Sequence, residues 1–409
     1  MAANDLIELG STGLKRQGGY IYEEYLPELQ GVKWLAAIRR MIDEPVLGAI
    51  LYAIESLVGN VEWNIVPTEP TRKDDVAAAT FIADCWKNFD EPFSDIMAEI
   101  LTMFPYGFAP LEIVYTRRPD GKIGWRTWAI RAQDTVTEWL FSERGDVTGL
   151  VQMAPPNYRP VTIPAEKLLL FRTTSQRGNP EGRSLFRPAY NPWYFKVKLA
   201  NIEGIGVERD LAGLPVAHVP PELLSANANP TQKAILASIR EIVTNIRRDE
   251  QEGVIWPMAY DNEGRLVYKL ELLASAGTRQ FDTGEIIKRY QQEMVLVTLG
   301  DFILLGHENV GSYSLASSKT AMFVSALGVY LKRICGVINR HAIPRLLALN
   351  GMSGRAICQH GDIETMDLDM LGNYISNLAG VGVPLDAPNI AQYLRDQAGI
   401  PRPETQDTK

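Results

Sequence analysis

The residue types that could do chemistry are present, but the spacings of known catalytic motifs are not. The chain has no G-x-S-x-G nucleophile elbow, no H-E-x-x-H metal helix and no dinucleotide-binding G-x-G-x-x-G. The stretch from Gly311 to Thr320 resembles a phosphate loop, but it lacks the glycine before Lys319 that lets backbone amides surround a phosphate. We interpret it as a flexible loop that leads into a helix.

Two groups of acidic residues could act in acid–base chemistry or hold a divalent cation. The first lies near expected strand ends and comprises Glu138, Glu143 and Asp146; the second comprises Asp362, Glu364, Asp367 and Asp369. The second group lacks the spacing of a calcium loop, and acids are common at turns and at helix starts. We therefore assign no catalytic, cofactor-binding or metal-binding residue, and we keep a metal-dependent hydrolase as an alternative function.

Thiols and imidazoles are too few and too scattered for a zinc site. The cysteines are Cys85, Cys335 and Cys358, without a C-x-x-C spacing, and the histidines are His218, His307, His341 and His360. An odd, sparse set of cysteines is typical of a reducing compartment. The N-terminal sequence lacks the features of a signal peptide, and the longest apolar stretch, residues 46–58, is too short to span a bilayer. We expect no membrane association.

One local group of arginines and one set of tryptophans could contact nucleic acid. The arginines are Arg172, Arg177, Arg183 and Arg187, and the tryptophans are Trp125, Trp128 and Trp139. Few basic residues lie between the tryptophans, so we expect these to pack against helices rather than to stack on bases. For the arginines, we favour ion pairs with acids of a neighbouring subunit over contacts with DNA.

The composition is that of a folded protein with several domains. The chain has 409 residues, of which 46% are hydrophobic, and its 41 basic and 49 acidic residues give a net charge of −8. This length predicts two to four domains. A sequence-reading DNA-binding protein would be basic, because its affinity comes largely from phosphate neutralisation, so this class is excluded.

The sequence predicts helices first and then short strands as the elements that position these residues. Residues 1–30 are polar and predict an arm. Pro45 opens a helix whose inward stripe we expect at Val46, Ile50, Ala53 and Leu57. A strand at 61–65 and helices at 74–87 and 94–104 follow. Between residues 108 and 172 the period changes to two, which predicts one small antiparallel sheet.

Two long helices enclose a compact insert in the second half. The first begins at Asn191-Pro192. Its residues Trp193, Val197, Ala200, Gly204, Val207 and Leu211 recur at alternating steps of four and three, which predicts a stripe that packs against a partner helix. The insert reads as a strand, a helix from Asn229-Pro230 and a hairpin at 253–273. The second helix is expected at 278–299. A polar loop at 305–319, a helix at 320–350 with a kink at Pro344, a strand at 355–360 and a helix at 367–380 complete the chain.

The segment RGNPEGRSLFRPAYNPWYFKVKLANIE, residues 177–203, resembles the portal proteins of tailed bacteriophages, and in particular the Mu-like family. Three later segments resemble the same family in the same order: GDFILLGHENVGSYSLASSKTAMF, INRHAIPRLLALNG, and the tail LAGVGVP followed by IAQYLRDQAGIPRP. The resemblance extends from about residue 30 to residue 403.

The resemblance implies an α+β portal fold whose parts follow one another along the chain. They are an N-terminal arm (1–30), the first part of a wing (31–189), stem helix 1 (190–212), an α/β clip (213–275), stem helix 2 (276–300), a tunnel loop with a long helix and a return to the wing (301–365), and crown-like helices with a tail (366–409).

The resemblance also implies a function. The chain would form a ring, usually of twelve subunits, at one capsid vertex of the virion, after synthesis in the bacterial cytoplasm. It would pass double-stranded DNA without reading its sequence, and it would contact the terminase large subunit, a head–tail adaptor and the major capsid or scaffold protein. The residues expected to face the DNA are His307, Asn309, Ser312, Tyr313, Ser317, Ser318 and Lys319. No cofactor and no catalysis are implied, and a virion adaptor that forms no ring is a further alternative.

Overall fold

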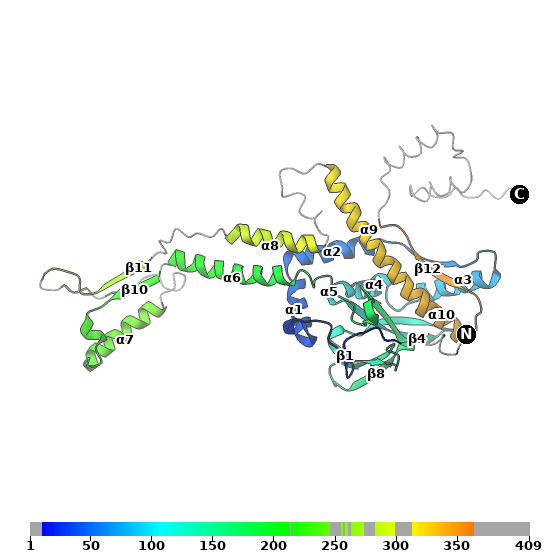
Figure 1. The fold of residues 1–409 in the computed structure, drawn as a ribbon, viewed down its shortest axis with the longest axis horizontal. Helices are drawn as coiled ribbons and strands as arrows, with labels where there is room; N and C mark the ends of the chain where they lie inside the picture. The colour runs from blue at the N-terminus through cyan, green and yellow to red at the C-terminus, as the bar shows by residue number, and fades with distance from the viewer. Residues whose placement is uncertain are drawn as a thin grey trace. The chain divides into compact units, whose positions relative to one another are not determined.

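The computed structural model describes residues 10–212, 214–245, 255–256, 258–260, 263–273, 283–298 and 313–363. The chain divides into two compact units, one formed by Met1–Ala189 with Val295–Lys409 and the other by Tyr190–Met294. Each unit combines helices with antiparallel strands, as the sequence predicts (Figure 1).

The N-terminal arm is a hairpin that packs on the first unit. Its strands are β1 (Arg16–Gln17) and β2 (Tyr20–Ile21), and the Trp139 amide donates to the Gly19 carbonyl at 3.0 Å. A 3₁₀ turn (Pro27–Leu29) and α1 (Gly31–Ile42) follow. The sequence analysis missed α1, although this helix buries Ile38 and Met41 completely.

Helix α2 (Pro45–Gly59) begins where Glu44 and Pro45 predict it. The Glu44 carboxylate accepts hydrogen bonds from the amides of Val46 and Leu47 at 2.9 and 3.1 Å. The expected inward stripe is wrong except at Ile50, because the buried residues are Leu47, Ile50, Leu51, Ile54 and Val58. The helix is apolar around most of its circumference, so the sequence pattern did not separate neighbouring stripes.

Three helices and an aromatic cluster follow. The helices are α3 (Lys73–Lys87), α4 (Phe93–Leu101) and α5 (Met103–Tyr106). Phe89 stacks on Trp125 with ring centroids 5.8 Å apart, and Trp125 meets Trp128 edge to face at 5.2 Å. Trp125, Trp128 and Trp139 are each at most 2% exposed. The prediction that the tryptophans pack against helices is confirmed for Trp125 and Trp128, which meet Trp86 of α3, whereas Trp139 packs among strand residues.

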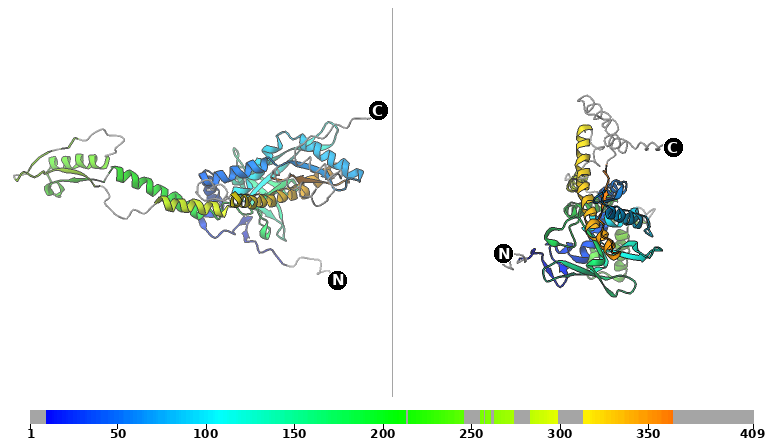
Figure 2. Two further views of the ribbon diagram at one scale, coloured as in Figure 1. Left: turned by 90° about the horizontal axis from the view of Figure 1, so that it is seen from above. Right: turned by 90° about the vertical axis from the view of Figure 1, so that its right-hand side faces the viewer.

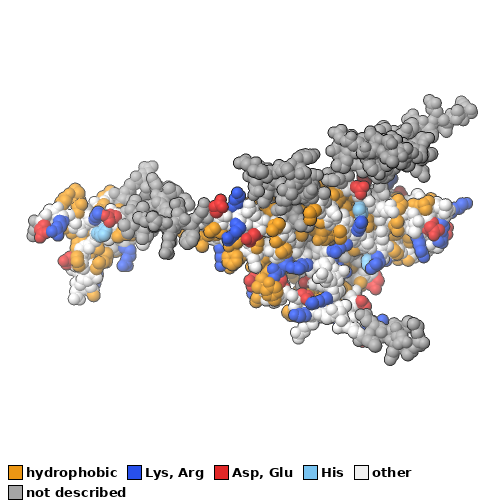
Figure 3. All heavy atoms as spheres, turned by 45° about the horizontal axis from the view of Figure 1, so that its top comes forward, with side chains coloured by type: hydrophobic (Ala, Val, Ile, Leu, Met, Phe, Trp, Pro, Cys, Tyr) orange, Lys and Arg blue, Asp and Glu red, His pale blue; other side chains and the backbone are white. Residues whose placement is uncertain are grey.

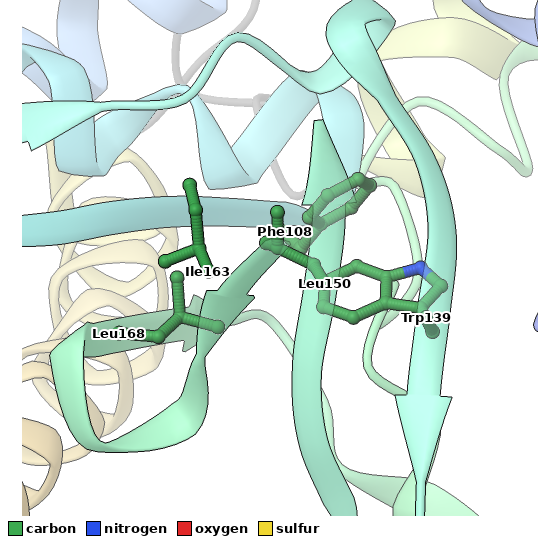
Figure 4. Close-up of a cluster of buried hydrophobic side chains, with 5 residues drawn as sticks. All are labelled: Phe108, Trp139, Leu150, Ile163 and Leu168. Carbon is green, nitrogen blue, oxygen red and sulfur yellow. The ribbon is translucent and has the colours of Figure 1, made fainter. Parts of the chain in front are cut away.

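Residues 108–172 form two three-stranded antiparallel sheets, where the sequence predicted one. One sheet has the order β5-β4-β9 and the other β6-β7-β8. Their strands are β4 (Phe108–Arg117), β5 (Ile123–Ile130), β6 (Val136–Phe141), β7 (Val147–Met153), β8 (Pro160–Pro164) and β9 (Leu168–Arg172). The sequence analysis missed β8 because its prolines resemble a turn. Figure 4 shows the core that both sheets share: Phe108, Trp139, Leu150, Ile163 and Leu168.

A separate two-stranded sheet joins distant parts of the first unit. Strand β3 (Trp63–Pro67) pairs antiparallel with β12 (Ala356–His360), with Ile65 opposite Cys358. The expected strand at 355–360 is thus present. Helix α3 packs on this sheet, and Asn339 binds the backbone of Cys358 from the other side of β12.

The long C-terminal helix is interrupted earlier than expected. Helix α9 (Tyr313–Val337) passes through a π-helical turn (Ile338–Ala342) into α10 (Ile343–Leu349). Helical backbone continues through this turn, so Pro344 removes the hydrogen bond to the Arg340 carbonyl, which accounts for an interruption that precedes the proline. By length and composition alone Met322–Leu349 could cross a membrane, but α9 packs against α2, β9 and β12 and buries Leu327, Leu331 and Ile334.

The second unit is built around two helices. Its elements are α6 (Tyr190–Ala212), β10 (Leu214–His218), a 3₁₀ turn (Pro221–Leu224), α7 (Pro230–Asn245), β11 (Lys269–Leu273) and most of α8 (Thr283–Val297). Helix α7 begins in a reciprocal cap between Asn229 and Gln232. The expected 253–273 hairpin is present in part: Tyr260 and Leu266 form an antiparallel bridge, and the Val267 amide donates to the Ala259 carbonyl at 2.8 Å, whereas β11 pairs with β10.

Candidate functional sites

The segment that precedes α6 is held by a close contact between two glycines. Gly182, at φ +59°, leaves no room for a side chain, since a Cβ atom there would come within 2.3 Å of the Gly107 carbonyl oxygen. Gly107, at φ +92°, is equally tight against the Glu181 carbonyl oxygen, at 2.5 Å. Only glycine fits both positions without strain. The G-x-P-x-G part of the segment therefore joins its turn directly to the start of β4.

Side chains of the same segment extend this contact to both sheets. The Trp139 indole N–H donates to Glu181 Oε1 at 3.1 Å. Burial raises the pKa of Glu181, and the hydrogen bond from Trp139 offsets only part of that rise. On the other side, Arg172 Nη1 donates to the Asn179 carbonyl at 2.9 Å. Within the chain, these residues have a structural role.

Two arginines of this segment bind the N-terminal arm. Arg177 pairs with Glu23 at 3.1 Å, and Arg187 makes a two-point contact with Glu24. Burial alone would raise the pKa of Glu24, but the hydrogen bonds from Arg187 and from the Leu26 amide, with the Arg187 charge, hold it below its ordinary value. The acidic partners Glu23 and Glu24 were not identified from the sequence, because they lie more than 150 positions away from the arginines.

Most of the arginine group already has partners within one chain, and its expected inter-subunit role stays a prediction. Arg177 and Arg187 are paired within the chain, and burial lowers the pKa of Arg172, whose guanidinium is turned onto Asn179. Arg177 and Arg183 are the exposed members of the group. On the face shown in Figure 3, basic and acidic side chains of the described residues are interspersed rather than gathered by sign.

The expected stripe on α6 is buried only at its start. Trp193 is 5% exposed and Val197 is half-buried, whereas Ala200 and Gly204 are exposed. Val207 and Leu211 lie in α6, but their side chains are outside the described part of the structure. A Cβ atom on Gly204 would meet nothing within 4 Å.

Helix α6 meets α8 through a different set of residues. The Phe195 and Tyr290 rings stack with centroids 6.2 Å apart, and the Thr283 hydroxyl donates to the Glu203 carboxylate. The two helices lie side by side in all views (Figures 1 and 2). Apolar side chains remain exposed on α6: Phe195 at 50%, Ile202 at 63% and Ile205 at 50%. This helix thus carries an uncovered apolar surface.

Part of the expected DNA-facing loop is helical. His307, Asn309 and Ser312 lie outside the described residues. Tyr313, Ser317, Ser318 and Lys319 belong to the first turns of α9, so the loop does not continue to Lys319. Leu315, Ala316 and Lys319 are strong helix formers, and they outweigh the loop preference of the serines between them.

The acidic groups do not form a metal site in the described part of the chain, which contains no group of three or more His, Cys, Asp or Glu residues able to hold an ion. Glu143 and Asp146 lie at the exposed turn between β6 and β7. Asp362 is described and exposed, whereas Glu364, Asp367 and Asp369 lie outside the described residues.

Two cysteines that are far apart in sequence interact in the structure. Cys335 on α9 and Cys358 on β12 are buried, and a hydrogen bond between their thiols, with burial, raises the pKa of Cys358. No local sequence pattern predicts this pair, because neither residue belongs to a short motif.

Comparison with known proteins identifies relatives of the whole chain. The family model described as the portal protein of Mu bacteriophage matches residues 35–400. A chain of the neck of an empty gene transfer agent particle, computed with C6 symmetry, is 13% identical with a TM-score of 0.54, over 90% of this chain and 94% of that one. A chain of the native particle's neck, computed with C12 symmetry, is 12% identical with a TM-score of 0.52, over 91% and 95%. A chain of the native virion is 13% identical with a TM-score of 0.53, over 90% and 94%.

Proposed function

Because this chain belongs to the portal protein family of Mu bacteriophage, a structural and non-enzymatic class of virion component, we propose that twelve copies form a ring at one vertex of a capsid. The ring would be the conduit through which double-stranded DNA is packaged and later ejected. The observation that carries this proposal is the family match over residues 35–400. The similarity of fold to a neck chain from a particle computed with C12 symmetry supports the number twelve.

The stem of the ring would consist of residues 190–212 and 276–300. The exposed Phe195, Ile202 and Ile205 on α6 support this assignment, because apolar side chains on a helix surface become favourable when a neighbouring helix covers them. In a ring, one face of α6 in each copy would pack against a different face of the next copy. Repeating this contact around the axis would close the ring. The wing would be formed by residues 31–189 with the return at β12.

The clip, residues 213–275, would meet the packaging motor, the terminase large subunit, and later a head–tail adaptor. The wing would meet the capsid or scaffold protein, and residues 366–409 would form a crown. DNA would pass His307, Asn309 and Ser312 and then the first turns of α9, with Lys319 as a single transient phosphate contact. A net charge of −8 per subunit supports passage without tight binding, because strong phosphate neutralisation would hold the duplex in place.

The experiment that tests this function is negative-stain electron microscopy of the purified chain, with mass photometry on the same sample. We expect rings with a central hole and a mass close to twelve subunits. Small oligomers without an axial hole, unchanged when capsid and motor proteins are added, would contradict the ring and favour an adaptor. Chelator-sensitive nuclease activity of the purified chain would instead favour the hydrolase.

A further inference from the structure

Strand β3 has one paired edge and one open edge. Opposed residues of an antiparallel pair alternate between hydrogen-bonded and non-hydrogen-bonded positions. The Cys358 amide and carbonyl both bind the Asn339 side chain, at 2.6 and 3.0 Å, and so point away from β3. The Ile65–Cys358 pair is therefore non-hydrogen-bonded, and the backbone N–H and C=O of Ile65 point away from β12.

The hydrogen bonds on either side of the Ile65–Cys358 pair agree with this alternation. The Thr68 amide donates to the Arg355 carbonyl at 3.2 Å, and the Glu62 carbonyl accepts from the Gly361 amide at 2.8 Å. The backbone N–H and C=O groups of even-numbered residues in this segment thus point toward β12, and those of odd-numbered residues point toward the other edge. Within the described part of the chain, the backbone of Ile65 has no hydrogen-bond partner at that edge.

A groove of about 400 Å³ lies beside the open edge, between β3 and α3. Its lining is mixed: the apolar residues are Ile65, Pro67, Val76, Ala79 and Ala83, and the polar or charged residues are Thr80, Asp84 and Lys87. Free backbone groups at a strand edge, beside a groove that can receive alternate side chains, are the arrangement to which an extended segment adds as a further strand. The outer edge of β12 cannot serve in this way at Cys358, because Asn339 occupies it.

The described chain ends close to this sheet and leaves a long segment of sequence outside it. Its last residue, Ile363, follows β12 by three positions, and residues 364–409 lie beyond. In that sequence Val381, Val383 and Leu385 alternate with Gly382 and Pro384. With the helix expected at 367–380, residues 364–380 can span roughly 30 Å, whereas crossing from β12 to the open edge of β3 needs about 10 Å.

We propose that Val381–Leu385 of the same chain adds to the open edge of β3 as a third strand, with Val381, Val383 and Leu385 in the groove against α3. In an added strand, the residues opposite Ile65 and its odd-numbered neighbours place their side chains on the groove side of the sheet. The backbone N–H and C=O groups of the same residues point toward β3. The backbone of Pro384 then points outward, where its missing N–H costs nothing in an edge strand. Five residues of the 366–409 segment would thereby extend the β3–β12 sheet, and the rest of that segment would be left for the proposed crown.

Amide hydrogen exchange of the full-length chain tests this docking, read in overlapping peptides that cover residues 62–68. Val383→Asp places a charge in the groove, and we expect exchange at Ile65 to accelerate roughly tenfold or more. Asn389→Asp is the matched control, since it adds the same charge outside the alternating segment and should leave Ile65 protected.

A second pair of variants changes residues of α3 instead of the C-terminal segment. Thr80→Trp fills the groove and should also accelerate exchange at Ile65, whereas Ala77→Trp, at an exposed position of α3 that does not line the groove, should not. Fast exchange at Ile65 in the unmodified chain overturns the proposal. Slow exchange in all four variants overturns it as well, because something other than this segment would then protect the edge.

Discussion

Gly107 and Gly182 lie so close together that the Gly107 carbonyl oxygen occupies the space in which a side chain at position 182 would begin. Their positive φ values, +92° and +59°, add a second reason for glycine at both positions. The same carbonyl of Gly107 also accepts hydrogen bonds from the backbone amide and the hydroxyl of Thr173, at 3.0 and 3.2 Å. The turn before α6 is therefore anchored by backbone rather than by side chains.

Replacing Gly182 by alanine should destabilise the chain by about 3 kcal/mol, because strain at positive φ adds to a clash with a backbone oxygen. Thermal unfolding should show a Tm lower by roughly 5–10 °C. Gly121→Ala is the matched control: Gly121 has φ +82° but open space around it, so only about 1 kcal/mol should be lost. Equal losses in the two variants would show that the close approach has no energetic weight.

Replacing Glu181 by glutamine should raise the stability of the folded chain relative to the parent, and by more at neutral pH than at acidic pH. The pKa of Glu181 is raised in the folded chain, so the native carboxyl contributes stability at low pH that is lost as the pH rises through the folded value. Glutamine keeps an acceptor for Trp139 and has no charge to bury. The Tm difference between variant and parent should thus be more positive at pH 7.5 than at pH 4, whereas exposed Glu143→Gln should show no such change.

Replacing Glu24 by glutamine should release the N-terminal arm. The pKa of Glu24 is lowered in the folded chain, so its contribution is present at neutral pH and is lost as the pH falls through that lowered value. At pH 7 we expect exchange of the Tyr22 amide, which binds the Lys15 carbonyl at 2.8 Å, to become roughly tenfold faster. At low pH, after correction for intrinsic rates, parent and variant should converge.

The control for the arm is Glu28→Gln, because Glu28 is exposed and has no side-chain contact among the described residues. This variant should match the parent at both pH values. A Glu24 variant that leaves the arm as protected as in the parent would show that Arg187 and Glu24 do not hold it.

Replacing Gly204 by leucine should separate subunit stability from assembly. The position is open within the chain, and leucine is a better helix former than glycine by about 1 kcal/mol, so the subunit should not lose thermal stability. If α6 packs against a neighbouring copy, the added side chain should shift assembly to higher concentration, which mass photometry measures. Gly336→Leu makes the same change at an open position of α9 and should assemble like the parent. Unchanged assembly of the Gly204 variant would remove this glycine from the interface.

Local sequence signals predicted the helix starts well. Glu44-Pro45 and Asn229-Pro230 both initiate helices as expected, because a cap and its proline act within one turn. The inward stripe of α2 and the division of residues 108–172 into two sheets were not predicted. Both depend on which surfaces meet, and β8 reads as a turn until β7 pairs with it.

The arginine group shows why site predictions are harder. The sequence identified the four arginines correctly as a local concentration of charge, but it could not reveal that Glu23 and Glu24 return from the arm to bind two of them. The serines before Lys319 indicated a loop, whereas the surrounding helix formers extend α9 back to Tyr313. In each case long-range or cooperative contacts decide the outcome, and a short window of sequence does not contain them.

The chain leaves the first unit at Ala189 and returns to it at Val295, and the helices at these two crossings run side by side through Phe195 and Tyr290. Entry and exit are thus close together, as in an inserted cassette. Such a cassette can be lengthened, shortened or exchanged at its far end while its host keeps the same connections. A chimera that keeps α6 and α8 but carries a foreign segment in place of residues 214–273 should therefore retain the folded first unit.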